Sequence, residues 1–123
     1  AILRAAGLKR GEATVVTGGP SCQPFSTAGR RGSVEDPRGK LFHEFCRVVR
    51  EARPRFFVME NVPGMLSAAV THRPLKERGV GYPPLEHDEQ LGSALLAVLR
   101  ELRGLGYHVV FDVLNAADFG TPQ

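Results

Sequence analysis

The 123-residue sequence lacks the features of a disulfide-stabilised, secreted or membrane-spanning protein. Its two cysteines, Cys22 and Cys46, form no Cys-x-x-Cys pair, so nothing in the sequence indicates a disulfide framework and a reducing compartment is the simpler interpretation. No apolar run approaches the length of about 20 residues that spans a bilayer. The first residues also lack the charged-then-apolar plan of a signal peptide. We therefore expect a cytoplasmic protein with no membrane partner.

Histidines are few and scattered, which leaves little to bind a metal ion. His43 and Cys46 lie three residues apart in one predicted helix, and this spacing suits a metal only if Cys22 joins them. Because there is no second spaced pair of ligands, we expect no metal site and interpret His43 as an ordinary helix residue.

The chain is long enough for one domain, and 42% hydrophobic residues are enough for a core. Its net charge of +3 is compatible with a nucleic-acid partner but does not demonstrate one. The cations cluster in one glycine-rich stretch, at Arg30, Arg31, Arg38 and Lys40. A solvated loop is the alternative explanation of this cluster.

Short apolar runs alternate with helical patterns along the chain. In order, they predict a strand at 13–17, a long loop at 18–40, a helix from 41 that Pro54 ends, a strand at 55–59, an irregular excursion at 70–88, a helix at about 89–103 and a strand at 107–114. The continuous apolar run at 55–59 is typical of a sheet covered on both faces. This order predicts an α/β sandwich with a largely parallel sheet.

Two of the predicted strands end in residues that could carry chemistry. Cys22 follows the first strand on a turn that Gly18, Gly19 and Pro20 make tight and stiff. A helical turn after Cys22 would favour its thiolate, although a free cysteine is more often a small buried hydrophobe. Glu60 follows the second strand and is either a paired structural acid or a functional one, with a pKa that partial burial would raise.

These segments resemble the catalytic core of the cytosine-5 DNA methyltransferases. Gly18-Gly19-Pro20-Ser21-Cys22-Gln23 matches the family's Pro-Cys motif, and Glu60-Asn61-Val62 matches its Glu-Asn-Val motif. The resemblance implies the Rossmann-like fold of S-adenosylmethionine-dependent methyltransferases. It also implies that the Cys22 thiolate attacks C6 of a flipped cytosine, that Glu60 acts at N3, and that a methyl group passes from S-adenosylmethionine to C5.

Further positions take roles from the same resemblance. The partner that it implies is double-stranded DNA, and it leaves room for a cognate restriction endonuclease system in the cell. The stretch at 29–39 is similar to the loop that closes over DNA, and residues 114–123 are similar to the segment that leads into the family's Gln-x-Arg-x-Arg motif. The implied nucleic-acid-binding residues are Gln23, Ser26, Arg30, Arg31 and Arg38, the cofactor-binding residues are Ser21 and Leu41, and the supporting residues are Pro20 and Asn61, whose amide could orient the carboxyl group or hold the loop.

The chain also departs from the family's pattern. It has no glycine-rich cofactor loop, ribose-binding acid or target-recognition domain, and Ser21 stands where many members have a second proline. The chain opens at Ala1 in mid-pattern and closes at Gln123, before the family's arginines. We therefore expect residues 1–123 to be a partial catalytic domain that is inactive alone, with the excursion at 70–88 as an insertion.

Three alternatives remain open at the level of the sequence. A transfer-RNA cytosine-5 methyltransferase of the same fold shares both motifs. An unrelated enzyme with a cysteine nucleophile, such as a hydrolase or a redox protein, is disfavoured because no histidine follows a strand in an apposed position and no Cys-x-x-Cys is present. A noncatalytic binding fragment is the third.

Overall fold

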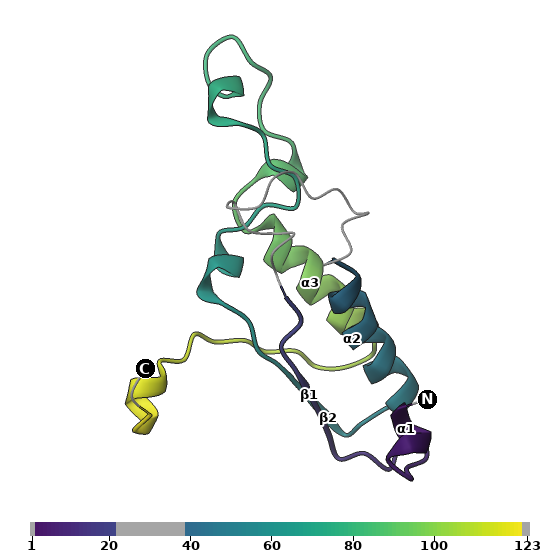
Figure 1. Ribbon diagram of the computed structural model, residues 1–123. Coiled ribbons are helices and arrows are strands. Elements are labelled where there is room, and N and C mark those ends of the chain that lie inside the picture. Colours follow the sequence, from purple (N-terminus) through teal and green to yellow (C-terminus); the bar gives the residue numbers. More distant parts are fainter. Residues whose placement is uncertain (1, 22–38, 122–123) are drawn as a thin grey trace.

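The computed structural model describes residues 2–21 and 39–121 (Figure 1). Its regular elements are helix α1 (Ile2–Ala5), strand β1 (Val15–Gly18), helix α2 (Gly39–Ala52), strand β2 (Phe56–Met59) and helix α3 (Ser93–Gly104), with short 3₁₀ turns η2 (Pro63–Leu66), η3 (Leu75–Glu77), η4 (His87–Glu89) and η5 (Ala116–Phe119). Both strands and both long helices lie where the sequence predicts them, within a few residues.

β1 and β2 form a two-stranded parallel sheet. Val15 pairs with Phe56 at one end of the register and Gly18 pairs with Met59 at the other. A parallel pair needs a crossover connection, and α2 lies in that connection and ends just before Pro54, which cannot continue a helix. The prediction of an α/β chain with parallel strands is confirmed by this pair.

The core lies between the inner face of the sheet and the two long helices, which run side by side (Figure 1). Phe57 points inward from β2, and its ring meets Phe45 of α2 at 6.0 Å and Tyr107 at 5.2 Å between centroids, both edge-on. Edge-on packing of this kind is a favourable aromatic geometry. The buried members of the core cluster are Phe42, Phe45, Cys46, Val49, Met65, Val98, Leu102 and Leu105.

The outer face of the sheet is not covered by the described residues. Alternate residues Val15, Phe56 and Val58 are exposed, so within the described ranges β2 is covered on one face only. The described residues therefore do not cover both faces, and the expected cover of the outer face stays a prediction. The apolar run reflects side chains on both faces of the strand, but the described helices pack against only one of them.

The predicted third strand at 107–114 is wrong. Tyr107 and Val109 pack against the core, and the Tyr107 hydroxyl donates to the Pro54 carbonyl at 2.7 Å. The backbone of 107–114, however, forms no ladder with any described residue, and Val110 and Phe111 are exposed. The β-branched and aromatic composition favours extended backbone, but a strand also needs a neighbour to bond with.

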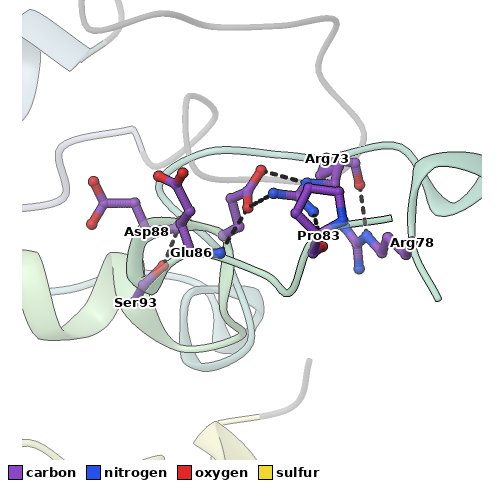
Figure 2. Close-up of polar contacts among 7 residues, drawn as sticks. Arg73, Arg78, Pro83, Glu86, Asp88 and Ser93 are labelled. Carbon is purple, nitrogen blue, oxygen red and sulfur yellow. Dashed lines mark hydrogen bonds and ion pairs between the residues drawn. The ribbon is translucent and has the colours of Figure 1, made fainter. Parts of the chain in front are cut away.

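The excursion that we expected to be irregular is tied down by an arginine (Figure 2). The Arg73 guanidinium forms a bidentate pair with Glu89, in which Nε lies 2.8 Å from Oε1 and both side chains are less than 15% exposed. Its Nη1 donates to the Pro83 carbonyl at 2.6 Å, and Arg78 Nε donates back to the Arg73 carbonyl at 2.8 Å. The Arg73 side chain thus joins the first part of the excursion to its last part, and the excursion is an ordered loop.

The base of the excursion closes on the first residue of α3. Ser93 is 3% exposed, and its hydroxyl accepts from the Val70 amide at 3.0 Å and donates to the Asp88 carbonyl at 2.9 Å. α3 begins here rather than at 89 because Gly92 takes a left-handed conformation, with φ 84°, that breaks the helix from the preceding turn. Figure 1 shows the excursion projecting beyond the carboxyl ends of the strands.

Candidate active site

Glu60 stands at the carboxyl end of the parallel pair. β2 ends at Met59, and the Glu60 amide donates to the Gly18 carbonyl at 3.0 Å, which continues the pairing one residue past the strand. The side chain is exposed, so the partial burial expected for it is wrong. Strand pairing therefore brings Glu60 level with the turn that leads toward Cys22.

The two glycines of that turn have different neighbours. A Cβ at Gly18 would lie 2.9 Å from Phe45 Cδ2, and a Cβ at Gly19 would lie 3.0 Å from Glu60 Oε2. Ordinary van der Waals contacts begin near 3.4 Å. Neither position has room for a side chain in the observed arrangement, because the backbone at Gly18 packs on the core and the backbone at Gly19 packs on the Glu60 carboxylate.

Asn61 holds the same turn from the other side. Its Nδ2 donates to the Pro20 carbonyl at 2.9 Å, across 41 positions of sequence, and its Oδ1 accepts from the Val62 amide at 3.0 Å. Of the two arrangements that the sequence left open for this amide, the structure has the one that holds the loop. Residues 18–20 are thus joined to residues 60–62 by one backbone and one side-chain hydrogen bond.

Several predicted site residues lie outside the described residues, so their roles stay predictions. They are Cys22, Gln23, Ser26, Arg30, Arg31 and Arg38. The described chain reaches Ser21, which is half-buried directly after Pro20. Leu41 lies on the first turn of α2 with 51% of its surface exposed. The structure therefore brings together Gly19, Pro20, Glu60 and Asn61.

The other thiol belongs to the core. Cys46 is 1% exposed between the helices, and burial, with a smaller contribution from Glu101, raises its pKa to about 11. A thiol in this environment is a poor nucleophile because the thiolate is the reactive form. In the described ranges, no three His, Cys, Asp or Glu side chains gather in a way that could hold a metal ion. No helix in those ranges is long and apolar enough to cross a membrane.

Comparison with known proteins identifies the family. The model of the C-5 cytosine-specific DNA methylases matches residues 3–123. The chain is 42% identical over 130 residues to the type II methyltransferase M.AquIA of Picosynechococcus, an alignment that covers 99% of this chain and 44% of that protein. It is 43% identical over 111 residues to M1.HphI of Haemophilus parahaemolyticus and 36% over 108 residues to M.FnuDI of Fusobacterium nucleatum.

These alignments cover 89% and 88% of this chain but only 24% and 25% of M1.HphI and M.FnuDI, respectively. The chain therefore spans less than half the length of the relatives that it matches. The match nevertheless extends through nearly all of its own residues and includes both strand ends that form the site. The chain belongs to the C-5 cytosine-specific DNA methylase family.

Proposed function

We propose that this chain is part of the catalytic domain of an S-adenosylmethionine-dependent DNA cytosine-5 methyltransferase. Cys22 is the nucleophile in this proposal, and Glu60 is the acid that acts at N3 of the target cytosine. The observation that carries the proposal is the pairing of 18–20 with 60–62 at the carboxyl end of a parallel sheet. Open α/β sheets bind their ligands at this end.

The proposed chemistry uses the two residues in turn. The Cys22 thiolate forms a bond to C6, and the negative charge that develops on the ring is neutralised by a proton from Glu60 at N3. C5 then becomes nucleophilic enough to accept the methyl group that S-adenosylmethionine supplies. A base from solvent, such as water, then takes the C5 proton, and the electrons of the C5–H bond form the C5–C6 double bond as the C6–S bond breaks and restores the thiolate. N3 returns its proton to Glu60. Because the base must leave the duplex to reach these groups, the substrate is a flipped nucleotide.

The cofactor and the remaining DNA contacts are also part of the proposal. Ser21 and Leu41 would supply one wall of the S-adenosylmethionine site, and the exposed apolar side chain of Leu41 is suited to packing against such a ligand. A single wall does not position a methyl donor, so we expect the 123-residue chain alone to be inactive. Phosphate and nucleotide contacts would come from the loop that carries Gln23, Ser26, Arg30, Arg31 and Arg38.

The exposed outer face of the sheet supports a covering layer from another part of the enzyme. Val15, Phe56 and Val58 form an apolar surface on β1 and β2, and a face of this kind is normally buried in a parallel sheet. We propose that the two strands belong to a larger Rossmann-like sheet, which further parts of the enzyme complete.

DNA is favoured over transfer RNA as the substrate. The family model is that of DNA methylases, and the relatives carry the name type II methyltransferase. On the basis of that name, we also propose that the same cell contains a cognate restriction endonuclease. The family match gives no support to an unrelated cysteine-nucleophile enzyme.

A covalent trap tests the role of Cys22. In the full-length enzyme, duplex DNA with 5-fluorocytosine at the target should capture the wild type, because fluorine cannot leave C5 as a proton does. The Cys22→Ser variant should not be captured, since an alcohol is a far weaker nucleophile than a thiolate. Cys46→Ala is the matched control and should be captured like the wild type. Equal capture of Cys22→Ser would exclude Cys22 as the nucleophile.

A further inference from the structure

The position of the Glu60 carboxylate depends on a glycine in the neighbouring strand's turn. Oε2 of Glu60 lies where a Cβ at Gly19 would approach it to 3.0 Å, closer than the ordinary contact range of 3.4–4 Å. A side chain at position 19 would therefore make the carboxylate shift by a few tenths of an ångström from its observed place. The carboxylate lies beside the space that the missing side chain leaves.

Little else in the described part of the chain fixes this carboxylate. The side chain is exposed, and no described residue donates a hydrogen bond to it or pairs with it. The backbone of Glu60 is held by the bond from its amide to the Gly18 carbonyl. Beyond that bond, the absence of a Cβ at Gly19 leaves the space beside which the carboxylate lies.

Gly18, the preceding residue, has a separate role. A Cβ there would lie 2.9 Å from Cδ2 and 3.0 Å from Cε2 of Phe45, which is 9% exposed and packs edge-on against Phe57. An aromatic ring held in the core cannot move aside without disturbing its neighbours. The carboxylate of Glu60, at the end of an exposed and flexible side chain, can move aside. The two adjacent glycines thus respond to the same substitution in different ways.

We infer that Gly19 is a positioning residue for the acid of the reaction, because its missing side chain provides the recess in which the Glu60 carboxylate lies. This inference rests on the proposed action of Glu60 at N3. Alanine at position 19 displaces the carboxylate by rotating a flexible side chain, so the fold is kept while the proton donor is moved. A displacement of about 1 Å from productive geometry can slow a reaction by about 10²-fold, so the smaller shift required here should slow it by about 10-fold or less.

The test compares four variants of the full-length enzyme: Gly19→Ala, Gly18→Ala, Glu60→Gln and the double variant Gly19→Ala/Glu60→Gln. We expect Gly19→Ala to lower kcat by about 3- to 10-fold with an unchanged KM for DNA. Its melting temperature should stay within about 2 °C of the wild type, whereas Gly18→Ala should lower the melting temperature more clearly.

The double variant decides whether Gly19 acts through Glu60. If it does, adding Gly19→Ala to Glu60→Gln should cost little further activity, because the group that Gly19 positions is already lost. A full additional loss, or wild-type kcat in Gly19→Ala alongside an impaired Glu60→Gln, would overturn the inference. Wild-type activity in Glu60→Gln would instead refute the proposed function of Glu60, and a strongly lowered melting temperature in Gly19→Ala would assign that glycine to stability.

Discussion

Replacing Asn61 with aspartate changes one hydrogen bond at the point where the two halves of the site are joined. In the structure, Nδ2 donates to the Pro20 carbonyl at 2.9 Å and Oδ1 accepts from the Val62 amide at 3.0 Å. Aspartate keeps an oxygen for the Val62 amide but has no donor for Pro20. It also directs a carboxylate oxygen at the Pro20 carbonyl oxygen. The turn therefore loses its hydrogen bond to residue 61 and is repelled by the new negative charge.

The expected effects on stability and on rate differ in size. A neutral hydrogen bond contributes about 0.5–1.5 kcal/mol, and leaving a buried acceptor unpaired costs about 1–3 kcal/mol. Pro20 is half-buried, so Asn61→Asp should lower the free energy of unfolding by about 1 kcal/mol. Cys22, the proposed nucleophile, follows the released carbonyl by two residues in the sequence, and misplacement of a reacting group by about 1 Å can cost about 10²-fold in rate. We therefore expect kcat to fall by about 10²-fold.

Denaturant unfolding and the rate of covalent capture by 5-fluorocytosine DNA together measure both effects in the full-length enzyme. Ser67→Ala is a suitable control, because among the described residues its hydroxyl makes only a long 3.4 Å bond to the Gly64 carbonyl in the preceding turn, η2. It should leave the rate and the unfolding curve unchanged. If Asn61→Asp were captured as fast as the wild type, the bond to Pro20 would have no part in placing the proposed nucleophile, Cys22.

Three further predictions concern the scaffold. Glu89→Gln should loosen the excursion and speed its amide hydrogen exchange. Because hydrogen bonds from the Glu86 amide and then from Arg73 hold the pKa of Glu89 below 4.5, the stabilisation is present at neutral pH and should be lost as the pH falls through that lowered pKa. Exchange protection of the wild-type excursion that does not change with pH would contradict this prediction. Cys46 should resist iodoacetamide at pH 8 until the chain unfolds, because its pKa is about 11 and it is 1% exposed. Leu102→Ala in the core should lower the free energy of unfolding by about 2–5 kcal/mol. A loss below about 1 kcal/mol would mean that the neighbouring core side chains move in to fill the cavity.

The sequence predicts the elements whose signals are local. The apolar stripe of α2 and the proline that follows it define that helix, and the two apolar runs define β1 and β2. The segment 107–114 has an equally clear β composition but forms no backbone ladder with another segment of the described chain. Composition reports the preferred backbone conformation of a segment, whereas a ladder depends on a second segment that composition does not identify.

The same limit applies to the site. That Glu60 follows a strand is visible in the sequence, because the motif and the apolar run are adjacent. The bond between Asn61 and Pro20 and the contact between Gly19 and Glu60 are not, since each depends on the register between the strands. The Arg73–Glu89 pair was missed for a similar reason: its partners lie 16 residues apart in a segment without periodicity.

The register itself depends on the core, and this connects the packing of the helices to the geometry of the site. Gly18 of β1 pairs with Met59 of β2, and the backbone of Gly18 fits against the Phe45 ring of α2. That ring packs in turn against Phe57 of β2. A slip of one residue would turn the inward side chains of β2 to the outer face and would carry Glu60 away from Gly19. The contacts that bury Phe57 therefore also determine which residue faces the carboxylate. Two consecutive glycines fit here for different reasons: the first, Gly18, packs against the Phe45 ring of the core, and the second, Gly19, leaves space for the Glu60 carboxylate.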